Sequence, residues 1–127
     1  MRPMSWRVLI AEDEPNIVLS LEFLLRQAKY EVRVARDGDE ALLLVETFSP
    51  HLVLLDVMMP ERNGFEVCEK IRANPASRRT KIIMLSAKGR ASEVDRGLAL
   101  GADAYVTKPF STQRLLEQVK ALLVEAG

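Results

Sequence analysis

Four short apolar segments of this sequence each lead into a residue that could do chemistry. The segment Leu52–Leu55 has no polar residue and is typical of a strand buried on both faces. The residues that follow or close the four segments are Glu12 and Asp13, Asp56, Ser86, and Lys108. If the strands are parallel, their carboxyl ends meet at one edge of the sheet, where open α/β sheets bind ligands. Acids, a hydroxyl group and an ammonium group then form one site.

The three carboxylates predict a metal site. Glu12, Asp13 and Asp56 would lie close together, and such like charges repel and raise one another's pKa. A hard divalent cation removes that repulsion, and Mg²⁺ suits a site with few protein ligands and several waters. The alternative is a solvated acidic loop, in which Glu12-Asp13-Glu14 only caps the following helix. Asp56 favours the metal site, because an apolar strand offers no other reason for a carboxylate at its tip.

The other candidate residues each have an ordinary structural explanation as well. Lys108 could neutralise negative charge added near Asp56, although most lysines are merely solvated. Ser86 could donate to a phosphoryl oxygen, but a serine at a strand end more commonly caps the strand or the next helix. Ala87 is small, so its backbone N–H could approach a ligand closely. Tyr105 is typical of a packed aromatic side chain near a sheet edge.

The composition fits one ordinary globular domain. The chain has 127 residues, of which 48% are hydrophobic and 28% charged. Lys and Arg together number 18, as do Asp and Glu, so nothing points to direct binding of nucleic acid. The single Cys68 excludes an internal disulfide and favours a reducing compartment. No apolar run approaches the ~20 residues of a membrane span. We therefore expect a cytoplasmic protein without a membrane segment.

Strand and helix patterns alternate five times along the chain. We expect strands at Arg7–Ala11, Glu31–Ala35, the segment ending at Asp56, Lys81–Ser86 and Ala104–Thr107. Helices should start at Pro15, at Asp37-Gly38-Asp39, before Val67, at Ser92 and at Ser111. Asn74-Pro75 should end the third helix, and Gly101 should follow the end of the fourth at Leu100. This alternation predicts an α/β fold with a parallel sheet and helices on both faces.

Taken together, these residues and their order resemble the receiver domains of two-component response regulators, which are CheY-like. The supporting segments are Val8–Glu14, Leu54–Pro60, Met84–Ala87 and Gly101–Phe110. The resemblance covers residues 7–123 and implies a single receiver domain over residues 1–127. It implies a doubly wound (βα)5 flavodoxin-like sandwich with the five-stranded parallel sheet in order 2-1-3-4-5. It also implies a cis peptide bond between Lys108 and Pro109.

The resemblance implies a role for each acid. Asp56 would accept a phosphoryl group from a phosphohistidine of a sensor histidine kinase or a phosphotransfer protein. Asp13, Asp56 and the backbone carbonyl of Met58 would hold Mg²⁺, which Glu12 would join directly or through water. Beyond its own phosphorylation and dephosphorylation, such a domain is not an enzyme.

The resemblance also implies how the phosphoryl group is bound and sensed. Lys108, Ser86 and the Ala87 N–H would bind its oxygens, which suits a reaction driven by positioning and charge neutralisation. Ser86 would move toward the added charge, and Tyr105 would fill the space it leaves. The face formed by the fourth helix, fifth strand and fifth helix would then change and regulate a downstream protein or an output domain.

Several positions depart from the pattern of the family. Position 12 is Glu where Asp is frequent, and position 86 is Ser where Thr is frequent. Met58 stands where some relatives have a carboxamide that orients attacking water, so we expect slow loss of phosphate. Some relatives dimerise through the face formed by the fourth helix, fifth strand and fifth helix. They have acidic residues where this chain has Ala104 and Arg114. We therefore expect a monomer or a weak dimer.

Three other functions use similar residues. A phosphohydrolase with an Asp nucleophile usually has a second Asp two positions later, where this chain has Met58. A nucleotide or flavin module would need a glycine-rich loop in place of Glu12-Asp13-Glu14, whose charge repels phosphates. A receiver that has lost its chemistry is disfavoured, because every needed residue type is present. The sequence names neither the kinase nor the target, and it fits a stand-alone receiver or part of a longer regulator.

Overall fold

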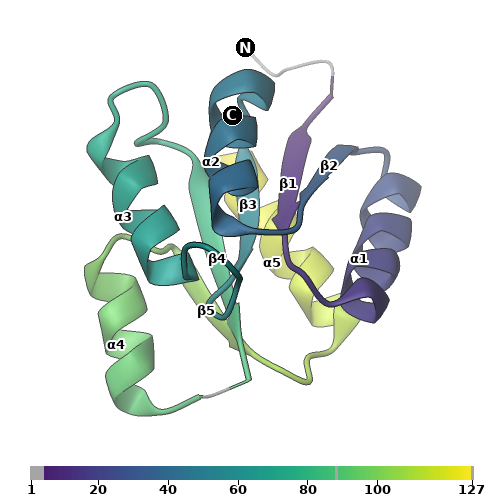
Figure 1. Ribbon diagram of the computed structural model, residues 1–127. Coiled ribbons are helices and arrows are strands. Elements are labelled where there is room, and N and C mark those ends of the chain that lie inside the picture. The colour runs from purple at the N-terminus through teal and green to yellow at the C-terminus, as the bar shows by residue number, and fades with distance from the viewer. Residues whose placement is uncertain (1–4, 88, 127) are drawn as a thin grey trace.

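Parallel strands alternate with helices throughout the part of the chain that the computed structural model describes, residues 5–87 and 89–126. The strands are β1 (Arg7–Ala11), β2 (Glu31–Ala35), β3 (Leu52–Asp56), β4 (Lys81–Ser86) and β5 (Ala104–Thr107). The helices are α1 (Pro15–Gln27), α2 (Gly38–Phe48), α3 (Gly64–Ala73), α4 (Ala91–Ala99) and α5 (Thr112–Ala126). Figure 1 shows this alternation, and all five predicted strands are confirmed.

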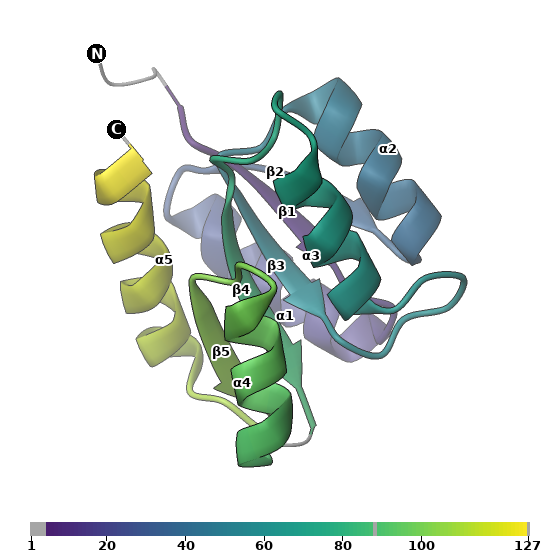
Figure 2. The same cartoon turned by 90° about the vertical axis from the view of Figure 1, so that its left-hand side faces the viewer.

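The sheet has the order β2-β1-β3-β4-β5, and every neighbouring pair is parallel. The apolar sides of α1 and α5 pack in one core cluster, and those of α2 and α3 pack in the other. Figure 2 shows α2, α3 and α4 in front of the sheet and α1 behind it. The protein is therefore a three-layer, doubly wound flavodoxin-like sandwich, as predicted.

The register of the sheet brings the carboxyl ends of four strands to one edge. Strand β3 is central, and all five of its residues are buried. Asp56 at its end pairs with Leu85 of β4, and the next residue of β4, Ser86, pairs with Thr107 of β5. On the other side of β3, Leu55 pairs with Ala11, the last residue of β1. The residues that follow these strand ends therefore emerge side by side.

Helix ends follow the local sequence signals. Pro15 occupies the first position of α1, where a missing N–H costs nothing. The Asp37 carboxylate accepts a hydrogen bond of 2.8 Å from the Glu40 N–H and caps α2. Asn74, which precedes a proline, leaves the helical region and ends α3. No helix in the described ranges is both long enough and apolar enough to cross a lipid bilayer.

Two helices differ by one residue from the sequence prediction. Helix α4 covers Ala91–Ala99 instead of the predicted Ser92–Leu100. Its N-cap residue Arg90 has an extended backbone and makes no side-chain cap hydrogen bond, so no capping signal marks the start of the helix. Gly101 follows with a φ of +108°, the positive value expected of a glycine beyond a helix end. Helix α5 begins at Thr112, and the preceding Ser111 accepts a 3.3 Å hydrogen bond from the Arg114 N–H.

Candidate functional site

Three carboxylates meet where β1 and β3 end. Glu12 is completely buried, Asp56 is 3% exposed, and Asp13 is exposed. One carboxylate oxygen of each acid lies within 4.8 Å of a carboxylate oxygen of both other acids. The fold therefore brings together the three acids that the sequence predicted, although they come from two strands that are about 40 residues apart in the chain.

The Lys108 ammonium group lies against two of these acids. Its Nζ is 2.7 Å from Glu12 Oε1 and 3.4 Å from Asp56 Oδ1, and its side chain is 16% exposed. The backbone N–H of Lys108 donates a 2.7 Å hydrogen bond to the Ser86 carbonyl, which ties the end of β5 to the end of β4. The peptide bond between Lys108 and Pro109 is cis, as the resemblance implied.

Glu12 shows whether the acids could hold a cation. Its Oε2 accepts hydrogen bonds from the backbone N–H groups of Asp13 at 3.0 Å and Glu14 at 3.2 Å. Its Oε1 is buried and makes no well-directed hydrogen bond to any residue within the described ranges, although the Lys108 ammonium is near. A buried oxygen with spare acceptor capacity, beside two further carboxylates, fits the oxygen ligands that Mg²⁺ requires.

The closeness of the acids changes their protonation. Burial and the neighbouring Glu12 raise the pKa of Asp56 to about 7, which the Lys108 charge only partly opposes. Burial also acts to raise the pKa of Glu12, but contacts with Asp56, Lys108 and the Glu14 N–H outweigh it and hold that pKa below its ordinary value. Burial acts to lower the pKa of Lys108, yet the two acids raise it. The effect expected from the sequence is therefore present at Asp56, whose pKa is raised, but not at Glu12, whose pKa is lowered.

The loop after β3 fixes the position of Asp56. Asp56 Oδ1 accepts a 3.3 Å hydrogen bond from the Met58 N–H, and the Gly64 N–H donates to the Val57 carbonyl at 2.8 Å. A Cβ atom on Gly64 would lie only 2.4 Å from the Asp56 carbonyl oxygen, so this contact requires glycine. The Met58 side chain is 68% exposed, so it is not part of the packed core.

The remaining predicted residues surround this cluster. Ser86 is 2% exposed and lines a cavity of about 180 Å³ together with Met58, Phe65 and Arg96. Ala87 and Lys108 share a second cavity of about 550 Å³ between the start of α1 and the loop that follows β5. The structure thus places both Ser86 and Ala87 on the sheet edge that carries the acids.

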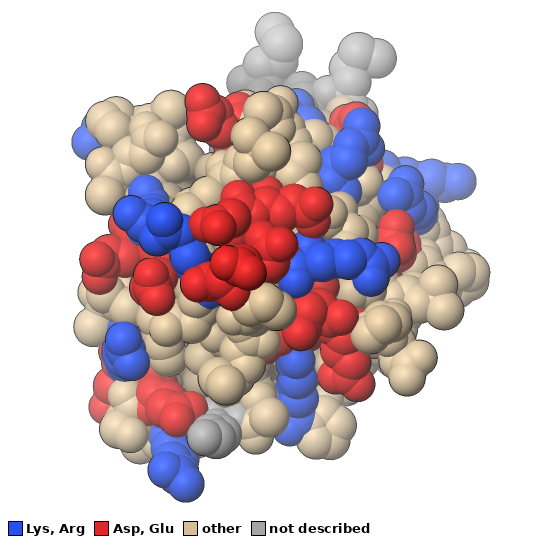
Figure 3. Space-filling model, in the orientation of Figure 1, with Lys and Arg blue, Asp and Glu red and all other residues tan. Residues whose placement is uncertain are grey.

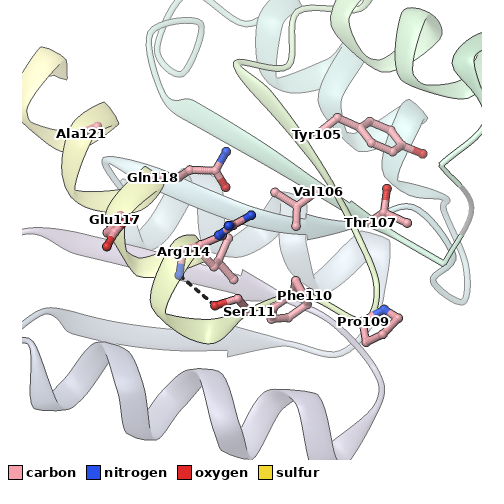
Figure 4. Close-up of a pocket in the computed structure, with 11 residues that line it drawn as sticks. Tyr105, Val106, Thr107, Pro109, Phe110, Ser111, Arg114, Glu117, Gln118 and Ala121 are labelled. Atoms are coloured by element: carbon pink, nitrogen blue, oxygen red, sulfur yellow. Dashed lines mark hydrogen bonds between the residues drawn. The ribbon is translucent and has the colours of Figure 1, made fainter.

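Tyr105 lies on β5, next to Met84 of β4 and close to Gly97 of α4. A Cβ atom on Gly97 of α4 would be 3.1 Å from the edge of its ring, and Met84 is its register partner on β4. The ring is half-buried and contributes to the core cluster under α3. Figure 4 shows the ring directed away from Arg114 and Gln118, which lie on α5. Tyr105 therefore packs as the sequence predicted, on the same side of the sheet as Met84.

Sequence reasoning missed two contacts at the site. It paired Lys108 with Asp56, whereas the shorter distance is to Glu12. It also gave no role to Arg96, whose guanidinium lies 4.3 Å from the centre of the Phe65 ring beside the Ser86 cavity. Both contacts depend on how helices pack and how side chains are oriented, so no local motif signals them.

Figure 3 shows acidic side chains grouped near the middle of one face, with basic side chains on either side.

A comparison with family models finds one match. The model for the response regulator receiver domain matches residues 8–120, which include every acid of the site as well as Ser86, Tyr105 and Lys108.

Solved structures agree with this match. A candidate response regulator from Chloroflexus aurantiacus is 36% identical with a TM-score of 0.89, covering 94% of this chain and 98% of that one. The receiver domain of DrrB, solved in a BeF3-activated form, is 33% identical with a TM-score of 0.85 and coverages of 94% and 98%. A CheY-like receiver domain protein from Methanospirillum hungatei is 32% identical with a TM-score of 0.90, covering 96% of each chain.

Proposed function

The chain belongs to the response regulator receiver domain family, and we propose that Asp56 is the phosphoryl acceptor of this signalling switch. In this proposal the Asp56 carboxylate attacks the phosphorus of a phosphohistidine on a sensor histidine kinase or a phosphotransfer protein. A bond between phosphorus and the carboxylate oxygen forms while the bond between phosphorus and the histidine nitrogen breaks. The observation that carries the proposal is the burial of Asp56 beside a second acid and an ammonium group.

The surrounding charges support this reaction. The phosphoryl group adds about two negative charges next to acids that already repel one another. Lys108 is close enough to neutralise part of that charge, and Ser86 and the Ala87 N–H stand on the same edge of the sheet. We assign all three to binding of the phosphoryl oxygens, because positioning and charge neutralisation supply most of the catalysis in phosphoryl transfer.

We propose that Mg²⁺ takes part at the acidic cluster. Asp13, Asp56 and the Met58 carbonyl would hold the ion, and Glu12 would contact it directly or through water. A bound divalent ion supplies positive charge that offsets the developing charge on the phosphoryl oxygens. The buried Glu12 Oε1 with its spare acceptor capacity supports this assignment. The chain itself keeps the Asp56 oxygen oriented through the Met58 N–H.

The position of Ser86 supports a proposal for the output of the switch. Movement of its hydroxyl toward the phosphoryl group would leave space beside β4, and the Tyr105 ring lies next to the same strand. We propose that Tyr105 fills this space and alters the face formed by α4, β5 and α5. A downstream protein or an output domain then recognises the changed face, and the phosphorylated and unphosphorylated forms behave as a two-state element.

The same family membership supports a proposal for the location and oligomeric state of the protein. We propose a cytoplasmic receiver with residues 7–123 as its folding core, acting as a monomer or weak dimer. The buried free thiol of Cys68 is compatible with a reducing compartment. Neither Ala104 nor Arg114 is acidic, which argues against a dimer held by charged pairs at these two positions of the face formed by α4, β5 and α5.

The test is a reaction with a small phosphodonor. Acetyl phosphate and Mg²⁺ should add one phosphoryl group to the wild type, measured as intact mass, and none to Asp56→Asn. Asp95→Asn is the matched control, because Asp95 is exposed on α4, away from the acidic cluster, and should leave the gain unchanged. The proposal fails if Asp56→Asn gains as much as the wild type. Repeated turnover of phosphomonoesters would instead favour a phosphohydrolase.

A further inference from the structure

A second charged pocket lies at the opposite end of the sheet from the acidic cluster. It has a volume of about 400 Å³ and lies where β4 begins and α5 ends. Its lining residues are Arg72, Arg78, Arg79, Lys81, Gly101, Asp103, Glu125 and Ala126. Figure 1 shows the C-terminus at the same end of the molecule as the start of β1, whereas the acids follow the far ends of the strands. We name these eight residues the basic pocket.

Arg72 lines the basic pocket, and its guanidinium group already makes four hydrogen bonds. Its guanidinium donates to the carbonyl oxygens of Gly101, Arg78 and Thr80, and to Asp103 Oδ2 at 2.9 Å. These bonds tie α3, the segment before β4 and the turn before β5 together. The pocket is therefore built on a fixed frame, as ligand sites usually are.

The acid nearest to this frame is engaged as well. Asp103 Oδ2 accepts from Arg72 and also takes a 2.8 Å hydrogen bond from the backbone N–H of Ile82. Asp103 and Arg72 therefore cancel each other's charge. The net charge that the pocket presents to a ligand comes from its other side chains.

Three further cations line the basic pocket. Arg78 and Arg79 are exposed, Lys81 is half-buried, and none of them forms an ion pair with any residue in the described ranges. Glu125 is the other acid of the lining, and its carboxylate makes no ion pair within the described part of the chain either. The C-terminal end of α5 contributes only about half of a negative charge. A concave site with a surplus of positive charge attracts anions.

We propose that the basic pocket binds a small anion with two adjacent phosphate groups, either inorganic pyrophosphate or a nucleoside diphosphate. Guanidinium groups match phosphate oxygens in a bidentate way, and two arginines with a lysine supply the charge for a diphosphate. The volume lies in the range of small-molecule sites and accommodates a diphosphate with or without a nucleoside. Glu125 and the end of α5 repel such a ligand, so its phosphates should lie on the side of Arg78 and Arg79.

The site would act separately from phosphorylation of Asp56. Its residues come from α3, the segment that leads into β4, the start of β4, the turn before β5 and the end of α5, whereas Ser86 lies at the other end of β4. A ligand in the basic pocket would therefore not contact Asp56 or the other acids of the acidic cluster.

The experiment adds inorganic pyrophosphate stepwise to the full chain in 150 mM NaCl and EDTA, and the backbone amide signals are recorded by NMR at each step. Inorganic pyrophosphate should shift the amide signals of Thr80, Lys81 and Gly101 with a saturable curve. Arg79→Gln should weaken binding about tenfold, as loss of a charged hydrogen bond does. Arg36→Gln, which removes an exposed arginine on another surface, should leave binding unchanged. Glu125→Gln should tighten binding about twofold, because it removes a repulsive charge.

Parallel titrations with ADP and adenosine identify the ligand class. If ADP and pyrophosphate bind with equal affinity, the basic pocket recognises only the diphosphate group. If ADP binds with higher affinity than pyrophosphate, the pocket also recognises the nucleoside. Both results support the proposal. Three results overturn it: no saturation by either anion up to 1 mM, equal weakening by Arg79→Gln and Arg36→Gln, or binding of adenosine as tight as that of ADP. Folding of each variant is checked by its amide spectrum without ligand.

Discussion

The Lys108 ammonium lies 2.7 Å from Glu12 Oε1 and is therefore closer to Glu12 than to Asp56, whose Oδ1 is 3.4 Å away. One cation thus serves two buried acids. A phosphoryl group on Asp56 would attract Lys108 toward it, and a divalent ion among the acids would repel Lys108. The position of this ammonium group should therefore respond both to Mg²⁺ and to phosphorylation, and the first prediction follows from that.

Replacing Lys108 should separate metal binding from phosphoryl transfer. Lys108→Met removes a cation that competes for Glu12 Oε1, so Mg²⁺ should bind several-fold more tightly in calorimetry. The same variant loses the group that neutralises the phosphoryl oxygens, so phosphorylation by acetyl phosphate should slow at least tenfold. Lys120→Met, on the exposed side of α5, is the control and should change neither quantity. Weaker Mg²⁺ binding in Lys108→Met would contradict this account.

The raised pKa of Asp56 predicts how stability depends on pH when no divalent ion is present. The folded protein keeps the Asp56 proton up to a pKa of about 7, whereas an unfolded Asp loses it near pH 3.9. Between these values the folded state binds more protons, so this group stabilises the fold at low pH. That contribution is lost as the pH rises through about 7. The free energy of unfolding should therefore fall between pH 5.5 and pH 8.5 because of Asp56.

Asp56→Asn isolates this effect. The variant has no proton to lose, so in EDTA the wild type should lose about 2 kcal/mol more of its free energy of unfolding than the variant between pH 5.5 and pH 8.5. Urea denaturation at both pH values measures the difference. Titration of His51, whose pKa is lowered by burial and by Arg7, affects both proteins equally and cancels. Parallel pH profiles for the two proteins would show that Asp56 ionises normally.

The contact between α3 and β3 predicts an intolerant glycine. In Gly64→Ala the new methyl group would lie 2.4 Å from the Asp56 carbonyl oxygen, and backbone atoms cannot move aside cheaply. Thermal unfolding should show a loss of about 2 kcal/mol. Gly97→Ala is the matched control, since its methyl group meets the flexible side chains of Met84 and Tyr105 at 3.0 and 3.1 Å. Equal costs in the two variants would be incompatible with a rigid contact at Gly64.

Met58 predicts the lifetime of the phosphorylated form. Its side chain is 68% exposed and follows Asp56 by two residues, so it can shield the acyl phosphate from water without contributing to stability. Met58→Asn supplies a carboxamide that can orient an attacking water, and loss of phosphate should become several-fold faster. Decay of the phosphorylated mass with time measures this rate. An equal or slower decay in the variant would rule out this role.

Much of the fold was predictable because its signals are local. The uninterrupted apolar run before Asp56 predicted the buried central strand, and Asp37 and Pro15 predicted where two helices begin. The strand ends then placed the acids, Ser86 and Lys108 on one edge, since parallel strands present their ends together. Helix α4 was predicted one residue late, because its N-cap residue Arg90 makes no side-chain cap hydrogen bond that the sequence could reveal.

Details of the site were less predictable, because they depend on side-chain orientation. No sequence pattern states that Lys108 approaches Glu12 more closely than Asp56, or that Arg96 packs over Phe65. The basic pocket also escaped prediction. Its cations are scattered over α3, the following loop and β4, and only the fold collects them around Glu125 and Ala126.

The most direct test of the central claim is to identify the residue that becomes phosphorylated. The protein is incubated with acetyl phosphate in Mg²⁺ or in EDTA, treated with borohydride, which converts an aspartyl phosphate to homoserine, and then sequenced as peptides by mass spectrometry. We predict homoserine at position 56 in Mg²⁺ and almost none in EDTA. Modification of another acidic residue, or equal conversion of Asp56 in both solutions, would contradict the proposed site.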